Sequence, residues 1–410
     1  MKILAADYIV TMDDECKIIR NGAVLFDSRI VEISFDRELA RSKYPHAQFE
    51  YLGENSVLMP SLINSHAHLE FSKNKTTLHY GNFIDWLTSV IENKDLTSEG
   101  LEEAMEEALS QMKKSGIGAL GAISSFGKDI EMLSSSGLRV VLFNELLGTT
   151  EERLEEVKSD FLRRFETAKR YSNSLFEPAL SVHSAYACSP RLIDFAVSFA
   201  KEHNLKVSAH FMESKSERFW LDNNRGEFKA FFKAYFGIEK SALRADEFLD
   251  KFGGVHTLFV HCTHANGFEL ENMIENGSFV VHCPVSNRLL GMKLFDIETA
   301  KNMGIDYITA TDGLSSNYTL NLWNELRSAM FGYTDFSLKI LPYDLLKSVT
   351  INAAKALGLN SGKIEAGKNA DFIAFRLPGE VDDDEYLPLQ IILHTNEVEK
   401  LIISGAEING

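Results

Sequence analysis

Two histidines separated by one residue stand out in the stretch "INSHAHLEF", residues 63–71. Along a β-strand, residues i and i+2 point to the same side, so His66 and His68 can face one metal ion together. Neutral imidazole nitrogens are common ligands of zinc and similar divalent cations. The pair alone does not separate metal ligands from ordinary polar residues at a strand end, so a metal site requires further ligands elsewhere in the chain.

Later apolar runs end in residues that can supply those ligands. His210 follows one run in "SAHFMES", and Asp312 follows another in "ATDGLSSN". Three histidines and one aspartate, with water completing the coordination, make a plausible catalytic metal site. With His210 and Asp312 added, the interpretation of His66 and His68 as plain strand-end residues becomes much less favourable.

Two further residues are candidates for proton chemistry. Glu213 lies three residues beyond His210, where it can reach the attacking water without binding the metal and can carry a proton to a leaving group. The alternative for Glu213 is a solvated carboxylate favoured by a helix N-terminus. His261, in "FVHCTH", is placed to hold or polarise the attacking water and to stabilise developing charge.

Other polar residues at the ends of apolar runs are candidates for substrate contacts. His183, in "VHSAYACSP", is either a pocket residue or a hydrogen-bonded strand-end histidine. His264 is equally compatible with an exposed loop, and His282, after a valine run, is predicted to be buried. The predicted substrate-binding set is His183, Glu145, Ser315, Asn287 and Arg288.

These residues need a scaffold that brings many strand ends together. Short apolar runs alternate with helical patterns such as "RLIDFAVSFAKEHN", in which apolar residues recur at three- and four-residue spacing. Eight strand–helix units over about 300 residues fit an α/β fold of the (β/α)8 TIM-barrel type, whose functional residues gather at the carboxyl ends of the strands. The predicted strands are Val57–Ile63, Ala119–Ile123, Val140–Phe143, Ala179–Val182, Lys206–Ala209, Thr257–Val260, Ser278–Val281 and Tyr307–Ala310.

The two ends of the chain show a different pattern, with short strand-like segments and turns. Residues 1–55 and 361–410 are therefore predicted to form one small β-sandwich, with the barrel of residues 56–360 inserted between them. Two separate β-appendages are the alternative.

Composition excludes several classes of function. The chain has 410 residues, is 45% hydrophobic and carries a formal net charge of -17, which disfavours nucleic acids and anionic membranes as partners. Four cysteines without a Cys-x-x-Cys pair indicate neither a disulfide framework nor a thiolate zinc site. No signal peptide and no run of about 18 apolar residues is found, so a cytoplasmic protein is expected.

The motifs taken together resemble a known family. "MPSLINSHAHLEF", "AHFMES", "FVHCTH" and "TDGLSSN" are similar to the metal-binding strand ends of the amidohydrolase superfamily, in its chlorohydrolase and aminohydrolase branch. "GKIEAGKNADFIAF" resembles the C-terminal β-domain of that branch. Within it, "SHAHLEFSKNK" with "GNFIDWL", "CPVSNRLL" and "ATDGLSSN" is most similar to the aminodeoxyfutalosine deaminases of epsilonproteobacteria. The resemblance covers essentially the whole chain.

The resemblance implies roles for residues of this chain. His66, His68, His210 and Asp312 would bind one divalent ion, zinc with ferrous iron as the alternative. Glu213 would be the proton shuttle, His261 the electrostatic partner of the attacked carbon, and Asp312 would also accept a proton from the attacking water. Binuclear relatives carry a bridging lysine on the fourth strand, whereas "ALSVHSAY" has none. A single metal favours deamination over hydrolysis of a cyclic amide.

The expected activity is hydrolytic deamination of a purine nucleoside by metal-activated water, with conversion of 6-amino-6-deoxyfutalosine to futalosine in menaquinone biosynthesis as the best match. This substrate carries a benzoate, so its pocket should supply a cation, for which Arg288 is the candidate. The alternatives are deamination of S-adenosylhomocysteine, methylthioadenosine or adenine, a triazine-type chlorohydrolase, and a metal-binding barrel without catalysis. Residues 70–86 are expected to shape the pocket, residues 214–237 are long enough to form a lid, and a homodimer would be common among relatives.

Overall fold

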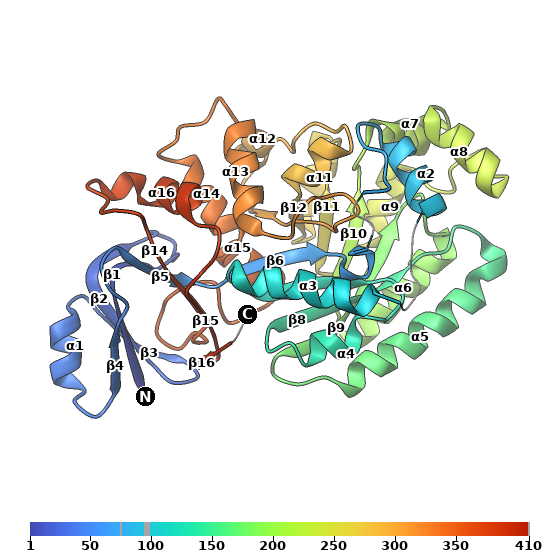
Figure 1. Cartoon of the computed structure of the whole chain (residues 1–410). Coiled ribbons are helices and arrows are strands. Elements are labelled where there is room, and N and C mark those ends of the chain that lie inside the picture. Colours follow the sequence, from blue (N-terminus) through green and yellow to red (C-terminus); the bar gives the residue numbers. More distant parts are fainter. Residues whose placement is uncertain (74–75, 94–98, 409–410) are drawn as a thin grey trace.

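The chain forms a β/α barrel flanked by a second sheet that is built from both of its ends (Figure 1). This computed structural model describes residues 1–73, 76–93 and 99–408. The terminal sheet lies at the left of the view, and the barrel with its helices fills the rest. Residues 74 and 75 of the predicted pocket stretch 70–86, and residues 409 and 410 of the predicted terminal domain, lie outside the described residues.

The barrel is an eight-stranded parallel sheet in which neighbours in sequence are neighbours in space. Its strands are almost entirely buried, which explains their near-continuous apolar runs. The first and last strands approach each other, since the backbone N–H of Asp312 donates to the His66 carbonyl at 3.1 Å. The strands are β6 (Leu62–Ala67), β7 (Ile117–Ser124), β8 (Arg139–Leu146), β9 (Phe176–Ser184), β10 (Val207–Phe211), β11 (Thr257–His261), β12 (Phe279–His282) and β13 (Tyr307–Thr309).

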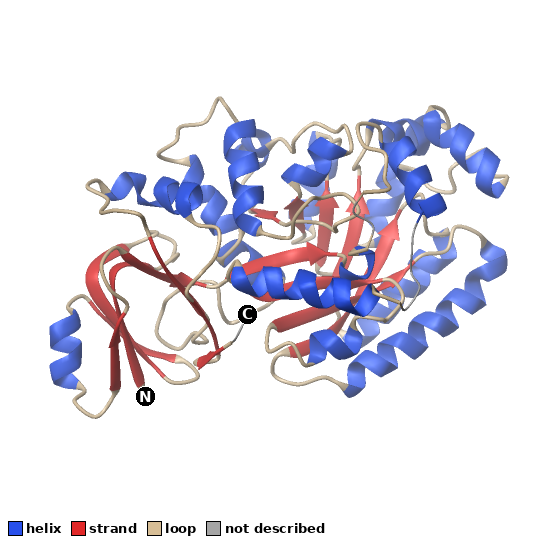
Figure 2. Cartoon of the chain, viewed as in Figure 1, coloured by secondary structure: helices blue, strands red, loops and turns tan. Residues whose placement is uncertain are grey.

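The helices surround these strands, as the blue ribbons outside the red arrows in Figure 2 show. Helix α6 (Pro190–His203) shows why they form where they do. Ser189 caps its first turn by accepting from Leu192 N–H, and Asn204 ends it at a φ of 51°. The residues that α6 buries recur at three- and four-residue spacing, so one face packs on the sheet.

The remaining helices of the barrel lie between its strands or, for the last three, after β13. They are η1 (Leu69–Phe71), α2 (Phe83–Asn93), α3 (Leu101–Lys114), α4 (Ile130–Ser134), η2 (Glu151–Arg153), α5 (Leu154–Arg170), α7 (Lys215–Asn223), α8 (Glu227–Phe236), α9 (Ala245–Lys251), α10 (Gly267–Glu275), α11 (Pro284–Leu289), α12 (Ile297–Asn302), α13 (Leu322–Gly332), α14 (Leu341–Ser348) and α15 (Ile351–Ala356). The predicted fold class, a (β/α)8 barrel with a small β-domain from both termini, is confirmed.

The second sheet is mixed, with the order β16-β15-β14-β5-β1-β2-β3, and β4 pairs with β1. A buried ion pair joins it to the barrel, since Arg139 at the start of β8 binds Asp371 with an Nε–Oδ2 distance of 2.5 Å. The predicted domain boundaries at residues 55 and 360 stay a prediction. The elements of this part are β1 (Lys2–Val10), β2 (Ile18–Phe26), β3 (Ile30–Ser34), α1 (Arg37–Lys43), β4 (Gln48–Tyr51), β5 (Ser56–Pro60), β14 (Phe372–Arg376), η3 (Asp384–Tyr386), α16 (Leu387–His394), β15 (Lys400–Ile403) and β16 (Ala406–Glu407).

One predicted strand proves to be two. The run 57–63 was expected to form the first barrel strand, but β5 belongs to the terminal sheet and β6 begins the barrel. Ser61 lies between them and donates its N–H to the Asp371 carbonyl at 3.1 Å. Both strands are fully buried, so hydrophobicity alone could not separate them. Across the described residues, no helix combines the length and the apolar character needed to cross a membrane.

Candidate active site

Three histidines converge at the carboxyl ends of the barrel strands. His66 is the fifth residue of β6, His68 follows that strand, and His210 lies in β10. Their ligand-type nitrogens all lie within 4.8 Å of one another, and the Nε2 atoms of His66 and His68 are 3.2 Å apart. The distances show that the His-x-His pair and the distant His210 face the same point in space.

Asp312 supplies a carboxylate to the same cluster. Its Oδ1 lies 3.6 Å from Nε2 of His66 and 3.6 Å from Nε2 of His68. Ser286 and Ser316 donate their hydroxyls to Oδ2 at 2.8 and 2.7 Å, and Gly313 N–H donates to Oδ1 at 2.8 Å. The two serines therefore occupy one oxygen and leave Oδ1 facing the histidines.

The protonation states of the cluster suit a cation. Burial lowers the pKa of His66, His68 and His210, so these rings are neutral near pH 7. Nδ1 of His210 must carry hydrogen, because it donates to the His183 carbonyl at 2.9 Å, and this leaves Nε2 with a free lone pair. Burial would raise the pKa of Asp312, but its interactions with His66, His68 and His261 hold it well below its ordinary value. Three neutral imidazoles and one carboxylate are a fitting donor set for a divalent cation.

The backbone that carries Asp312 is held firmly in a strained conformation. Asp312 has a φ of 62°, which is uncommon for a residue with a side chain. The side chain of Asn64 makes two hydrogen bonds with Thr311, the residue before Asp312. It accepts from the Thr311 N–H at 3.2 Å and donates to the Thr311 hydroxyl at 2.7 Å. Asn317 ties the same loop to the buried Glu325. The loop therefore presents Asp312 in one orientation.

Glu213 is a buried acid beside the cluster. It follows β10, and its Oε1 lies 3.4 Å from Nε2 of His261. Burial, and then the charges of Asp312 and Glu217, raise its pKa well above the ordinary value, which favours the protonated carboxyl. Glu217 also fixes the backbone here, accepting from the N–H groups of Met212 and Glu213 at 3.1 and 2.8 Å. Glu213 is therefore an oriented proton donor.

His261 ends β11 and lies between Glu213 and Asp312. Its Nε2 is 4.0 Å from Asp312 Oδ2, and its Nδ1 is 3.2 Å from Asn287 Oδ1. The ring is buried, which lowers its pKa. Asn287 was predicted to contact substrate. Its side chain is instead completely buried and contacts His261, and Asn287 is not among the residues that line the cavity described in the next paragraph.

A cavity of about 660 Å³ opens onto the cluster. This volume is in the range of sites for drug-sized ligands, roughly 300–1,000 Å³. Its polar end holds His68, His210, Glu213, His261 and Asp312. The rest is largely apolar and is lined by Phe71, Trp86, Leu87, Val90, Ile91, Phe126, Leu147, Val157, Tyr186, Ala187, Phe231, Phe232 and Phe236.

Three of the predicted substrate contacts do line this cavity. His183 lies next to His210, with ring centroids 4.9 Å apart. Glu145 accepts the Ser125 hydroxyl on Oε2 at 2.5 Å, whereas its buried Oε1 has no protein partner. Ser315 accepts from Trp86 Nε1 at 2.7 Å through its carbonyl. Glu145, His183 and His210 also bring ligand-type atoms within 4.8 Å of one another.

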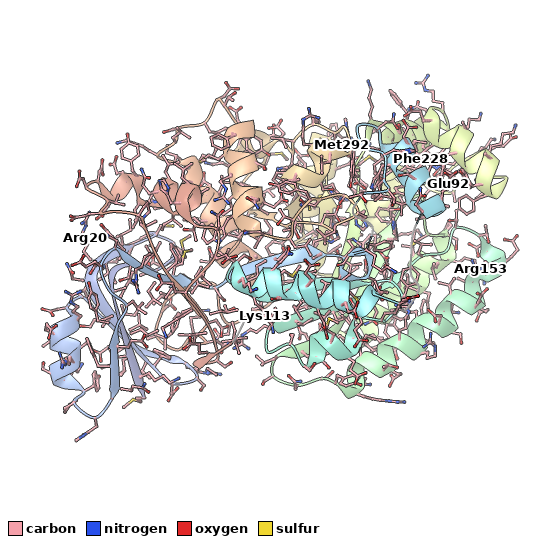
Figure 3. The ribbon with its side chains drawn as sticks, in the orientation of Figure 1. Arg20, Glu92, Lys113, Arg153, Phe228 and Met292 are labelled. Carbon is pink, nitrogen blue, oxygen red and sulfur yellow. The ribbon has the colours of Figure 1, made fainter. Side chains whose placement is uncertain are left out.

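Arg288 is placed elsewhere. It is exposed on α11 and is not among the residues that line the cavity, and neither is His264. The cavity contains instead Arg153 and Arg164, which the sequence did not single out. Figure 3 places Arg153, the last residue of η2, at the same end of the molecule as Phe228 of α8 and Glu92 of α2.

The remaining buried histidine, His282, has a structural partner. Its Nε2 pairs with the Tyr333 hydroxyl at 2.9 Å, in agreement with its predicted burial. Burial lowers its pKa to about 3, against about 6.5 in an unfolded chain.

A pH prediction follows from His282. Since its folded pKa is depressed, its stabilising contribution is present above pH 6.5 and is lost as the pH falls towards 3. Between pH 7 and 5 this loss amounts to about 2 kcal/mol. His282→Gln should therefore lose less unfolding free energy than the wild type over this interval, measured by chemical denaturation in chelator. An equal loss in both proteins would contradict the assignment.

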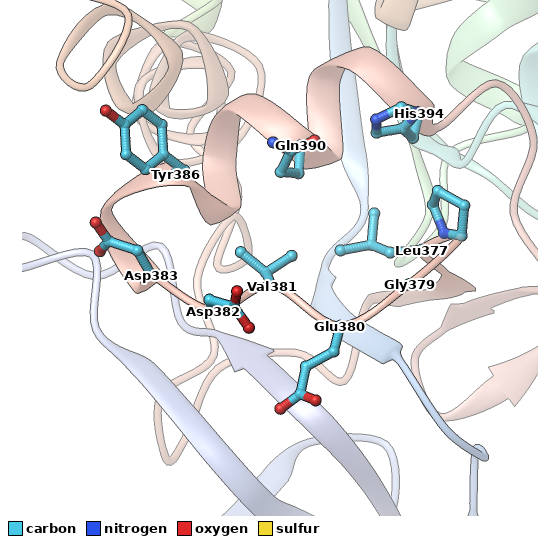
Figure 4. A pocket seen from close by; sticks show the side chains of 10 residues that line it. Leu377, Gly379, Glu380, Val381, Asp382, Asp383, Tyr386, Gln390 and His394 are labelled. Atoms are coloured by element: carbon cyan, nitrogen blue, oxygen red, sulfur yellow. The ribbon is translucent and has the colours of Figure 1, made fainter.

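A second hollow, of about 370 Å³, lies over the loop 377–383 and α16 (Figure 4). Acidic side chains such as Glu380, Asp382 and Asp383 line it. Within the part of the chain that the structure describes, the two sets of residues that could bind a metal ion, His66 with His68 and His210 and Glu145 with His183 and His210, lie at the barrel cavity and not at this hollow. The barrel cavity is therefore the candidate active site.

Known proteins resemble this chain over nearly its whole length. A model of the amidohydrolase family matches residues 57–408. The chain is 41% identical to the aminodeoxyfutalosine deaminase of Nitratiruptor sp., over 95% of this chain and 96% of that protein. It is 36% identical to an adenosine deaminase of Helicobacter pylori, over 99% of both. The crystal structure of Helicobacter pylori aminofutalosine deaminase in complex with methylthio-coformycin superimposes with a TM-score of 0.94 at 35% identity, and the match covers 100% of both chains.

Proposed function

This chain belongs to the amidohydrolase family, and from that premise we propose that it is a metal-dependent deaminase of purine nucleosides whose substrate is 6-amino-6-deoxyfutalosine. One observation carries the proposal: the buried carboxyl of Glu213, whose pKa is raised well above its ordinary value, and a cluster of histidines with Asp312 meet at the polar end of a large, otherwise apolar cavity. The similarity to an aminodeoxyfutalosine deaminase at 41% identity supports the choice of substrate.

His66, His68, His210 and Asp312 would hold one divalent cation. Zinc suits this nitrogen and oxygen donor set, with ferrous iron as the alternative. When bound, the cation supplies Lewis acidity that lowers the pKa of water and polarises it for attack.

Residues of the chain would then carry out the proton transfers. Glu213 donates its proton to the ring nitrogen next to the amino-bearing carbon, which makes that carbon more electrophilic. His261, whose Nε2 faces the same space, holds the attacking water and stabilises the charge that develops. Asp312 takes a proton from that water. The resulting hydroxide adds to the carbon, and Asp312 passes its proton to the amino group. Glu213 takes up the proton of the new hydroxyl as the carbon–nitrogen bond breaks, so that the carbonyl forms and ammonia leaves.

Other cavity residues would orient the nucleoside. Glu145 has an unpaired, buried Oε1, which suits a hydrogen bond from a ribose hydroxyl. His183, whose ring lies close to that of His210, would contact the purine. The apolar wall, which includes Trp86 and Phe231, offers aromatic surface for the remainder of the substrate.

The proposal is tested by ammonia release from zinc-loaded protein incubated with 6-amino-6-deoxyfutalosine, adenosine or methylthioadenosine. We expect kcat/KM for the first compound to exceed that for the other two by at least about tenfold, since only it fills the apolar chamber. Equal values for all three would remove the substrate assignment. Absence of ammonia from every purine nucleoside would remove the deaminase assignment itself, and chloride release from a chlorotriazine would favour the chlorohydrolase alternative.

A further inference from the structure

Few positively charged side chains line the cavity. Among the cavity-lining residues in the described ranges, the two with a positively charged side chain are Arg153 and Arg164. The guanidinium of Arg164 is committed to the protein, since it donates to the carbonyls of Ser124 and Glu145 at 3.1 and 2.7 Å and to Asp160 at 2.8 Å. Its side chain is only 5% exposed. Arg164 therefore has a structural role in the cavity wall.

Arg153 differs because its partner is a single exposed carboxylate. Its Nε and Nη2 donate to the two oxygens of Glu156 at 3.1 and 2.7 Å. Both side chains are 66% exposed, and both line the cavity. An exposed ion pair of this kind contributes little to stability, because water screens both charges. A second carboxylate can therefore replace Glu156 on the same two N–H groups at little cost.

Apolar side chains are exposed in the same cavity. Leu147 is 53% exposed and Phe236 is 45% exposed, although both line the cavity. Large apolar side chains left open to water in a cavity are typical of a ligand-binding surface. An arginine with a replaceable partner in a cavity that also exposes apolar side chains suits an aromatic ring that bears a carboxylate.

We propose that Arg153 selects substrates with an aromatic carboxylate, and that it exchanges Glu156 for that carboxylate when substrate binds. The inference rests on the proposed function, because the benzoate of 6-amino-6-deoxyfutalosine is the group that Arg153 would bind. Glu156 is then a competitor within the protein: it neutralises Arg153 in the free enzyme and repels the substrate carboxylate until the exchange takes place.

The test compares three variants on a charged and a neutral substrate. Arg153→Gln should raise KM for 6-amino-6-deoxyfutalosine roughly tenfold at unchanged kcat, the loss expected for hydrogen bonds to a charged group. It should leave KM for methylthioadenosine unchanged. Glu156→Gln should lower KM for the charged substrate by about two- to fivefold, since the competitor is gone. Arg170→Gln, at the last turn of α5, is the control and should change neither value.

The outcomes separate this inference from the proposed function. If the wild-type protein deaminates 6-amino-6-deoxyfutalosine but Arg153→Gln leaves its KM unchanged, or raises KM equally for both substrates, the role of Arg153 is overturned while the proposed function stands. A higher KM in Glu156→Gln would overturn the exchange. A wild-type protein that deaminates methylthioadenosine but not the charged nucleoside would overturn both the substrate assignment and the role of Arg153.

Discussion

Replacement of Glu213 by glutamine is expected to lower kcat by about a thousandfold while the metal content of the protein stays the same. Glutamine keeps the size of the side chain but has no proton to give, and general acid catalysis contributes roughly 10²–10⁴ to a rate. Burial, and then the charges of Asp312 and Glu217, raise the pKa of Glu213 well above its ordinary value, which favours the protonated form that a general acid needs.

The measurement is steady-state kinetics together with elemental analysis of the same samples. Glu271→Gln makes the same chemical change on the exposed surface of α10 and should retain full activity. A Glu213→Gln protein that keeps both its metal and its activity would show that Glu213 is not the proton donor.

The second large effect is expected from His68→Ala. Loss of even an outer partner of a metal ligand typically weakens metal binding roughly 10–100-fold, so removal of a ligand should weaken it by more than about 100-fold and abolish measurable activity. Titration with zinc against a competing chelator measures the affinity directly. His264→Ala removes a nearby histidine outside the cluster and should bind zinc as the wild type does. Unchanged affinity in His68→Ala would show that the ligand set is different.

Much of the fold could be predicted from the sequence because parallel barrel strands are buried on both faces. Seven of the eight predicted barrel strands lie at the observed positions, with ends that differ by a few residues. The exception is the run 57–63, where one apolar segment crosses from the terminal sheet into the barrel. Two consecutive buried strands look alike in sequence, and only their pairing partners, β14 and β7, distinguish them.

Part of the candidate site could be predicted from the sequence. The sequence locates the strand ends, and these are enough to group His66, His210, Glu213 and Asp312. The direction of a side chain on a short helix cannot be predicted from the positions of the strand ends. Asn287 and its neighbour Arg288 are both on α11, where successive side chains differ by about 100° in direction; one is buried against His261 and the other is exposed.

Arg153 was missed for a related reason. Nothing in "TTEERLEE" separates an arginine that faces a cavity from one that faces solvent, and its i,i+3 pairing with Glu156 is typical of an ordinary helix surface. The serine hydroxyls of Ser286 and Ser316 on Asp312 were also missed, although the position of Ser316 four residues after Asp312 was a usable signal.

The hydrogen bond from Asp312 N–H to the His66 carbonyl, which brings the two edges of the barrel sheet together, also determines when the site can exist. During synthesis, residues 66 and 312 are separated by most of the barrel, so the nascent chain has no complete metal site until its last strand has emerged and docked. An ion held by both residues acts as a cross-link between the earliest and latest parts of the barrel to be made. It would bind the closed barrel and not the open one, and would stabilise it by about 2.7 kcal/mol when free metal is a hundred times its dissociation constant. Metal supply would then influence how much folded enzyme a cell retains, in addition to how active that enzyme is.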